Sequence, residues 1–404
     1  MPTTQTQAQT RTRTTPASDR ALVRCLDPVA PGEFFERYFE QAPLHVARHE
    51  AGRFDELLSL EDVERDVCSG LLRYPAFRLV KAGAKLEPRE YTTDVPWRPS
   101  AFTGVANVAN VAAEFAAGAT IVLQALHLRH LPLALFCRDL EARLGHPVQA
   151  NAYYTPREAQ GLPVHHDTHD VLVLQLAGEK RWLVYDPVLE LPLKDQKYSA
   201  ELGEPGRPVL DLTLQAGDTL YLPRGWLHEA LTSDLDSLHL TAGINAYTAR
   251  DALRAAVEAA EEDVDLRHVV PHDGELAGDL LEAVGERLDP ETVAARMRER
   301  LVSTRNPILD GQLEQLRRLD ALTADTALER RPSVIADLHA IDDGVVLAFE
   351  GKRISLPAHA AEEVAFVVTT TDRFTAQALP GALDEAGRLV FVRRLIREGF
   401  LRAI

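Results

Sequence analysis

The sequence is poor in cysteine. Its three cysteines, Cys25, Cys68 and Cys137, are odd in number and widely spaced, and none belongs to a Cys-x-x-Cys pair. Disulfide frameworks use even sets of cysteines and occur in oxidising compartments. We therefore expect reduced thiols and a cytoplasmic protein.

Long apolar runs are also absent. No stretch reaches the roughly 18 apolar residues of a membrane-spanning helix, and the N-terminus lacks the apolar core of a signal peptide. Residues 1–19 are rich in Thr and Gln and too polar to pack, which predicts a disordered tail. A transit peptide has a similar composition and is the alternative for this segment. We expect no association with a membrane.

Basic residues are outnumbered. The chain has 44 Lys and Arg against 61 Asp and Glu, a net charge of −17. Such acidity argues against broad binding to a phosphate backbone, so no direct nucleic-acid binding is expected. An acidic surface tolerates or attracts a basic partner instead. The length of 404 residues, with 46% apolar and 26% charged residues, suits a globular protein of two or three domains.

The part of the chain after residue 19 mixes helices and strands. Residues 58–67 predict a helix with Ser59 as its N-cap. Residues 131–144 predict an amphipathic helix that ends near Gly145. Short apolar runs predict strands at 43–46, 77–80 and 121–123.

From residue 148 to about 245 the pattern changes to short strands separated by Gly and Pro. This pattern is typical of an antiparallel barrel or jelly roll. Gly178 is expected to turn the chain back, so that Lys180 begins a new strand.

The C-terminal part predicts two further regions. Residues 249–328 are helical and broken at Pro271, Pro290 and Pro307, and a helical segment with apolar faces often packs against its own copy. Beyond them, two strands around Gly351, a helix from His359 and a closing helix at 395–401 suggest a small winged-helix-like module.

The heptapeptide from Val164 to Asp170 gathers three histidines and two aspartates. If it is a strand, His165, Asp167 and His169 share one face. A His-x-Asp pair on one face supplies two of the three ligands of the 2-His-1-carboxylate triad that binds Fe(II) in non-haem oxygenases. The third ligand must come from elsewhere in the chain.

His228 is the candidate third ligand. It closes the run Gly217 to His228, which fits the second cupin signature, G-x5-P-x-G-x2-H, although Thr232 replaces the final Asn of that signature. In the first cupin signature, Asp167 stands for the second His and Val171 for the Glu. This departure selects His165, Asp167 and His228 as the metal site and favours an oxygen-activating iron. His166 and His169 are read as structural histidines, with His169 a possible neighbour of the pocket.

Lys180 is flanked by barrel sequence, where an unpaired ammonium is costly to bury. A dicarboxylate that chelates iron at one end would supply the anion at its other end. A solvated lysine in the charged turn 179–181 is an equally good interpretation from spacing alone.

Several motifs resemble those of the JmjC/cupin-type ribosomal oxygenases. They lie at 151–156, 160–163, 165–171, 174–182, 223–228 and 237–241, and the resemblance covers roughly residues 20 to 250. It implies a mainly β double-stranded β-helix core with N-terminal α/β elements, Fe(II) bound by His165, Asp167 and His228, and 2-oxoglutarate and O2 as cosubstrates. By motif position, the residues that would contact 2-oxoglutarate are Lys180, Asn151, Thr241 and Tyr153. His166 replaces an aromatic residue of the family.

The resemblance also implies a domain organisation and a reaction. We expect a disordered tail at 1–19, a JmjC/cupin catalytic domain at 20–248, a helical dimerisation domain at 249–328 and a winged-helix-like domain at 329–404. The expected protein is a homodimer that hydroxylates an Arg or His side chain of a protein, with a basic ribosomal protein as the partner implied. The alternatives are a JmjC-type demethylase, a small-molecule dioxygenase and a catalytically silent cupin scaffold.

Overall fold

The structure, a computed structural model, describes residues 13–14, 19–82, 86–260, 264–267, 269, 285 and 290–404. The chain divides into two units, one formed by Ser18–Ala246 and the other by Met1–Ala17 with Tyr247–Ile404. Within the described residues, no helix has both the length and the apolar character needed to cross a membrane.

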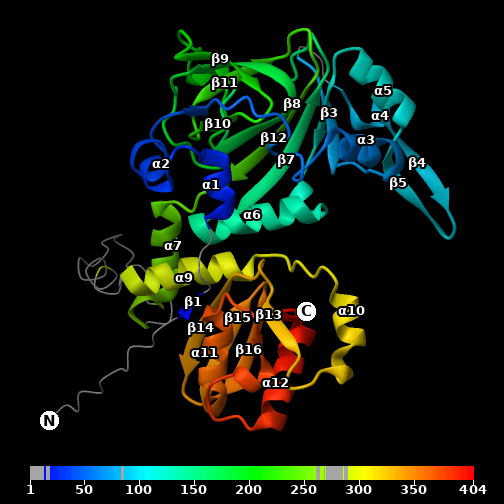
Figure 1. Cartoon of the computed structure of the whole chain (residues 1–404). Coiled ribbons are helices and arrows are strands. Elements are labelled where there is room, and N and C mark those ends of the chain that lie inside the picture. The colour runs from blue at the N-terminus through cyan, green and yellow to red at the C-terminus, as the bar shows by residue number, and fades with distance from the viewer. Residues whose placement is uncertain are drawn as a thin grey trace. The chain divides into compact units, whose positions relative to one another are not determined.

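A long bent strand organises the unit 18–246 (Figure 1). The first half of β8 (Asp170–Tyr185) pairs with β10 (Thr219–Leu222) and β12 (Ser237–Ile244). Its second half pairs with β9 (Leu210–Gln215) and β11 (Leu227–Leu231). Every pairing is antiparallel, so β8 belongs to both layers of a barrel-like core.

The larger layer extends on both sides of β8. Its order is β2-β10-β8-β12-β7-β6-β3, and the strands not yet given are β2 (Leu44–Val46), β3 (Phe77–Val80), β6 (Thr120–Leu123) and β7 (Val148–Thr155). The predicted strands at 43–46, 77–80 and 121–123 are thereby confirmed, as is the antiparallel barrel from residue 148.

Gly178 does not turn the chain back, as the sequence suggested. It lies inside β8 with φ +64°, and a Cβ atom there would stand 1.8 Å from the carbonyl oxygen of Asp236. Glycine adopts this left-handed conformation without steric cost. The residue therefore bends β8 where the strand changes partners, and the expected hairpin at 179–181 was wrong.

Six helices and two short 3-10 turns accompany the sheet among the described residues of this unit. They are α1 (Arg20–Leu26), α2 (Pro31–Arg37), α3 (Leu60–Ser69), α4 (Pro88–Tyr91), α5 (Val108–Ala116) and α6 (Leu131–Leu144), with short 3-10 turns η1 (Leu126–Leu128) and η2 (Ala200–Leu202). Ser59 caps α3 in a reciprocal capping box with Asp62, and Gly145 ends α6 with φ +73°. Both predicted helices are thus confirmed, because capping residues signal helix ends locally.

Two apolar clusters lie on opposite faces of the large layer. Alternate residues of β7 and β12, such as Ala150 and Leu240, pack into the main core with α1, α2, α3 and α6. Val171, Val173 and Trp182 of β8 belong to a second cluster with residues of β9 and β10. Strand alternation therefore leaves the interior of the barrel available for polar side chains from β7 and β12.

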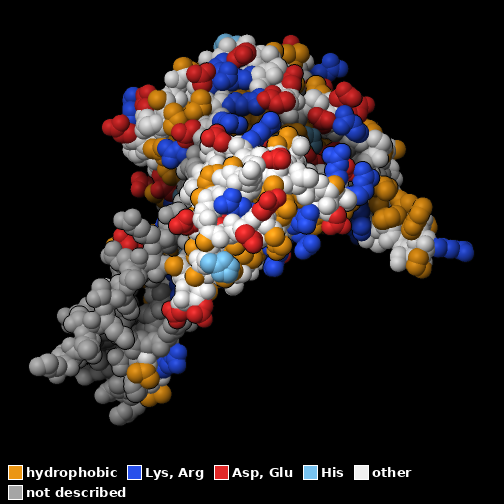
Figure 2. Space-filling view, turned by 60° about the horizontal axis from the view of Figure 1, so that its bottom comes forward, with side chains coloured by type: hydrophobic (Ala, Val, Ile, Leu, Met, Phe, Trp, Pro, Cys, Tyr) orange, Lys and Arg blue, Asp and Glu red, His pale blue; other side chains and the backbone are white. Residues whose placement is uncertain are grey.

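A two-stranded hairpin, β4 (Thr92–Trp97) with β5 (Ser100–Ala106), projects from this unit. Figure 2 shows hydrophobic side chains gathered on it, at the right of the view, on a surface where charges of both signs are otherwise mixed. Trp97 is 65% exposed, and its ring centroid lies 6.1 Å from that of Phe102.

The second unit combines helices and two small sheets. Its helices are α7 (Ala249–Ala260), α9 (Pro290–Ser303), α10 (Gln312–Arg317), α11 (Ala361–Thr369) and α12 (Glu385–Glu398), with 3-10 turns η3 (Val264–Arg267), η4 (Leu319–Ala321), η5 (Ala358–Ala360) and η6 (Ala376–Ala378). Its strands are β1 (Arg13–Thr14), β13 (Ala327–Arg330), β14 (Ala336–Ile341), β15 (Gly344–Phe349), β16 (Lys352–Pro357), β17 (Phe374–Thr375) and β18 (Leu401–Ala403). They form the sheets β1-β14-β15-β16 and β17-β13-β18.

Several expectations for this unit can be compared with the structure. The strand pair around Gly351 is confirmed as β15 and β16. The closing helix at 395–401 was placed wrongly: α12 begins at Glu385, where Asp384 caps it, and ends at Glu398, before Gly399 and strand β18. Arg13 and Thr14 of the expected tail pair with β14, whereas 1–12, 15–18 and the helix break at Pro271 lie outside the described residues. The winged-helix-like and dimerisation assignments stay predictions.

Candidate metal centre

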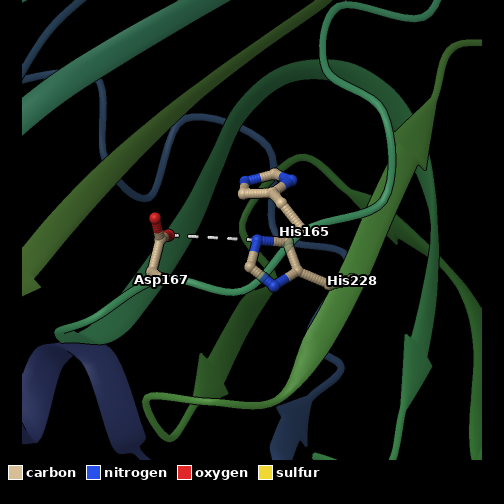
Figure 3. Close-up of side chains that lie close together, drawn as sticks. All are labelled: His165, Asp167 and His228. Atoms are coloured by element: carbon tan, nitrogen blue, oxygen red, sulfur yellow. Dashed lines mark ion pairs between the residues drawn. The ribbon is translucent and has the colours of Figure 1, made fainter. Parts of the chain in front are cut away.

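Two segments far apart in sequence bring His165, Asp167 and His228 together (Figure 3). His165 and Asp167 lie in the loop before β8, and His228 lies in β11. The backbones of His165 and His228 form an isolated antiparallel bridge, with N···O distances of 3.1 and 2.8 Å. Most of the heptapeptide is therefore a loop rather than the predicted strand. The bridge joins this loop to β11, the strand that carries His228.

The two histidines of the triad present the same ring nitrogen. Nδ1 of His165 lies 2.8 Å from the carbonyl oxygen of Pro163, and Nδ1 of His228 lies 3.0 Å from that of Trp226. Because a carbonyl only accepts hydrogen bonds, each Nδ1 carries the proton and each Nε2 keeps a lone pair. Both imidazoles are thereby oriented as metal ligands are, by a hydrogen bond from the nitrogen that does not bind the metal.

The spacing of the donor atoms suits one ion. The ligand atoms of the three residues lie within 4.8 Å of one another, and Nε2 of His228 lies 3.9 Å from Oδ2 of Asp167. An ion about 2.1 Å from each ligand holds them roughly 3–4 Å apart. The three residues thus fit a divalent metal, and two imidazoles with one carboxylate form the donor set of a facial triad.

The protonation states of the triad favour metal binding. Burial lowers the pKa of His228 to about 4, and the charge of His165 acts in the same direction. Burial raises the pKa of Asp167, but the neighbouring imidazoles, led by His169 and His228, lower this pKa by more. At neutral pH the site therefore offers a neutral imidazole and a carboxylate, the forms that bind metals.

Lys180 lies inside the same cavity as the triad. Its side chain is buried, and Nζ donates a 2.9 Å hydrogen bond to Oγ1 of Thr155, which is in turn 3.0 Å from Oγ1 of Thr120. Burial lowers the pKa of Lys180 to about 7. Among the described residues that line the cavity, the one carboxylate is Asp167, so the ammonium has no free counter-ion. The alternative of a solvated turn lysine is excluded.

Aromatic rings form a wall of the cavity. Tyr153 stacks on His239 with ring centroids 4.9 Å apart, and Trp182 meets His239 edge-on at 5.5 Å. Burial raises the pKa of Tyr153 to about 12, and burial lowers that of His239 well below its usual value, with the charges of Lys180 and His228 acting in the same direction. Both side chains are therefore neutral at pH 7.

The other residues named from the sequence fall into two groups. Tyr153 and Thr241 line the cavity together with Lys180 and the triad. Asn151 is not among the lining residues, although it pairs with Thr241 across β7 and β12, and its side-chain oxygen accepts a 2.9 Å hydrogen bond from Ala125 N. The structure therefore brings together all the candidates but Asn151.

His166 and His169 lie outside the cavity. Nε2 of His166 is 3.0 Å from the carbonyl oxygen of Gln196, and its ring packs edge-on against Tyr198. His169 packs against β12, where a Cβ atom on Gly243 would come within 3.0 Å of its ring. Two of the three histidines of the heptapeptide thus have packing roles.

Sequence reasoning missed His239 and Trp182, which line the cavity, and Thr155, which accepts the hydrogen bond from Lys180. All three occur in the motifs that carry the family resemblance, yet none has a spacing that marks it as functional. His239 does occupy a strand position that alternates with buried leucines, and this pattern was the one available signal.

Comparisons with known proteins agree with this geometry. A family model described as a JmjC domain matches residues 126–252. Over 257 residues the chain is 33% identical to ribosomal oxygenase 1 of Gallus gallus, covering 61% of this chain and 41% of the relative. Over 231 residues it is 30% identical to the bifunctional lysine-specific demethylase and histidyl-hydroxylase NO66 of Drosophila persimilis, covering 56% of this chain and 32% of the relative. The chain thus spans about a third to two fifths of the length of these relatives.

Solved structures extend the likeness of fold. The ribosomal oxygenase YcfD of Escherichia coli matches with a TM-score of 0.56 and 17% identity, over 93% of this chain and 98% of YcfD. A second structure of YcfD, in complex with cobalt and 2-oxoglutarate, matches with a TM-score of 0.55 and 17% identity, over the same 93% and 98%. Residues 126–252 therefore match a JmjC domain, and the YcfD structures share the fold of the chain. Its resemblance to the ribosomal oxygenases and its predicted mainly β JmjC core are confirmed.

Proposed function

We propose that the chain is an Fe(II)- and 2-oxoglutarate-dependent oxygenase that hydroxylates a side chain of a protein. One observation carries the proposal: two imidazole Nε2 atoms and one carboxylate converge in a cavity that also holds a buried, uncompensated lysine. A metal triad and a distant cation are what a chelating dicarboxylate requires. The name of the Gallus relative and the cobalt and 2-oxoglutarate in YcfD support the same activity.

Each residue of the cavity has a definable part in this proposal. Iron and 2-oxoglutarate, when bound, supply the oxidising chemistry with O2. His165, Asp167 and His228 would hold the ion. Lys180 donates to the far carboxylate of 2-oxoglutarate while Thr155 orients the ammonium. Tyr153, Trp182 and His239 form a wall that excludes water, Tyr153 and Thr241 flank the cosubstrate, and Asn151 acts indirectly through its neighbours.

The charge balance of the cavity favours histidine over arginine as the target. The charges of a divalent ion, Asp167, dianionic 2-oxoglutarate and Lys180 cancel, and no further carboxylate occurs among the described lining residues. A guanidinium is always charged, so it would enter the cavity without a counter-ion. A neutral imidazole needs no counter-ion. Two peptides that differ only in His or Arg at the target position would test this: the His peptide should be the better substrate, and equal turnover would contradict the preference.

Turnover of 2-oxoglutarate to succinate tests the activity itself. We expect turnover to require iron and to be abolished in His165→Ala and Asp167→Ala. His49→Ala is the matched control, since His49 is exposed and pairs with Asp218 away from the cavity, and it should retain turnover. Iron-independent protein binding without turnover would instead support the silent scaffold.

Two enzymatic alternatives give different products in the same assay. The name of the Drosophila relative includes a lysine-specific demethylase, and demethylation would release formaldehyde from a methylated peptide. A small-molecule dioxygenase would turn over 2-oxoglutarate in cell extract freed of protein. Mass spectrometry of ribosomal proteins from cells with and without this gene should show the gain of one oxygen atom if the proposed reaction is correct.

We further propose a basic ribosomal protein as partner, a cytoplasmic location and a homodimer formed through residues 249–328. The net charge of −17 supports a basic partner, and the names of the relatives support a ribosomal one. Cys25, Cys68 and Cys137 are all free thiols, which suits a reducing compartment.

A further inference from the structure

The metal ligands are held by two segments that must keep their mutual position. The loop with His165 and Asp167 precedes β8, and the corner from Pro223 to Trp226 precedes His228 in β11. Backbone hydrogen bonds join the segments at the His165–His228 bridge and from Gly225 N to the carbonyl oxygen of Asp167, at 3.0 Å. These bonds join the two main chains, and no side chain takes part in them.

A buried ion pair also joins the two segments through side chains. Asp170, three residues after Asp167, is fully buried, and Arg224, four residues before His228, is 7% exposed. Oδ1 of Asp170 accepts from Arg224 N at 3.2 Å, and Oδ2 accepts from Arg224 Nη1 at 3.2 Å. The Asp170 carboxylate thus accepts hydrogen bonds from both the main chain and the side chain of Arg224. Neither residue lines the cavity.

The pair is anchored to the N-terminal part of the unit. Tyr221 donates a 3.1 Å hydrogen bond to Oδ1 of Asp170, and its own hydroxyl accepts from Glu40 N at 2.9 Å. The Glu40 carboxylate forms a second ion pair with Arg224 Nη1. The ring of Tyr221 packs edge-on against Phe34 of α2, with centroids 4.8 Å apart. Tyr221 therefore connects the Asp170–Arg224 pair to the main core.

We propose that Asp170 and Arg224 are positioning residues that hold the Asp167 loop against the His228 corner and thereby set the affinity of the metal site. This inference rests on the proposed function, because it presumes that the triad binds a metal. Outer groups that orient ligands govern metal affinity in other metalloproteins. Burial raises the pKa of Asp170 above its usual value, and the charge and the backbone N–H of Arg224 oppose this rise.

Metal titration of the full chain tests the proposal. Cobalt(II) added to the metal-free protein reports binding through its visible absorption, and thermal unfolding without metal reports stability. In Asp170→Asn, we expect the dissociation constant for cobalt(II) to rise by about 10- to 100-fold. In the double variant Asp170→Leu with Arg224→Met, both buried charges are removed, which can preserve stability. The dissociation constant for cobalt(II) should nevertheless stay raised, because the hydrogen bonds between Asp170 and the Arg224 side chain are lost.

Glu40→Gln is the matched control. Glu40 is the second carboxylate partner of Arg224; its side chain is 34% exposed, and it belongs to neither ligand segment. Its replacement leaves the Asp170–Arg224 pair in place and should leave cobalt(II) affinity close to that of the wild type. A lower unfolding temperature with unchanged cobalt(II) affinity in both Asp170 variants would overturn the proposal, as would an equal loss of affinity in Glu40→Gln. If an Asp170 variant does not fold, Arg224→Lys takes its place, because lysine keeps the charge but not the planar guanidinium. We then expect a smaller rise in the dissociation constant for cobalt(II), and an unchanged constant would overturn the proposal. A wild-type protein that binds no cobalt(II) would instead refute the proposed function.

Discussion

At the scale of single residues, Lys180 connects burial with function. Its ammonium is buried and donates to Thr155, and the one carboxylate among the described lining residues, Asp167, belongs to the triad. An unpaired buried cation destabilises the ligand-free fold and favours binding of an anion. The sequence showed that Lys180 was flanked by barrel residues, but the direction of its side chain depended on the bend at Gly178, which local patterning did not predict.

Removal of this charge should weaken cosubstrate binding. In Lys180→Met, we expect the KM for 2-oxoglutarate to rise about 10- to 100-fold, because a hydrogen bond to a charged group is worth about 1.5–3 kcal/mol. Lys180→Arg, which keeps a cation, should show a smaller rise. Steady-state kinetics at varied 2-oxoglutarate measures both, and an unchanged KM in Lys180→Met would refute the assignment.

The lowered pKa of Lys180 predicts a pH dependence of the same step. With a pKa of about 7 in the ligand-free protein, the charged fraction of Lys180 falls about tenfold per pH unit above neutrality. Since the dianion binds the charged form, the apparent Kd for 2-oxoglutarate should rise with pH above about 7 and be level below it. Calorimetric titration across this range measures the slope. Lys180→Arg stays charged, so its Kd should be level throughout, and a level profile in the wild type would contradict the prediction.

At the scale of elements, the bend of β8 decides which side chains meet. Val171 and Val173 before Gly178, and Lys180 and Trp182 after it, all line one cavity. A straight strand of 16 residues would carry its two ends roughly 50 Å apart. The alternation of side chains was readable from the sequence, whereas the change of partner strands was a matter of tertiary pairing.

Gly178→Ala should destabilise the protein. A Cβ atom would stand 1.8 Å from the carbonyl oxygen of Asp236, and φ is +64°, so we expect a loss of at least about 1–3 kcal/mol in the free energy of unfolding. Gly206→Ala is the control, because a Cβ there meets nothing within 4 Å and its φ is not left-handed. Denaturant unfolding of both variants measures the difference, and equal stabilities would show that the bend tolerates a side chain.

At the scale of the whole molecule, the proposed site belongs to one unit. All residues of the triad and the cavity lie within Ser18–Ala246, which has its own apolar clusters. The second unit has a separate core formed around β15, α11 and α12. Binding of metal and cosubstrate and self-association are therefore expected to be separable properties.

A fragment of residues 18–246 tests this separation. We expect it to bind cobalt(II) and 2-oxoglutarate with affinities close to those of the full chain, since it contains every lining residue. Light scattering should show the full chain at twice the monomer mass and the fragment as a monomer. A dimeric fragment would place the proposed interface outside 249–328, and a fragment that folds without binding metal would show that the second unit contributes to the site.

The sequence by itself determined the identities of the chemical groups and the local elements. The G-x5-P-x-G-x2-H run, the His-x-Asp pair and the caps of α3 and α6 are local patterns, and local patterns report residue types and chain turns. Only the tertiary structure decided which groups converge. It placed His165 in the cavity lining but not His166 or His169, left Asn151 out of that lining, and paired Asp170 with Arg224. The reason is physical: strand pairing and burial join residues far apart in the chain, and no spacing along the sequence encodes those distances.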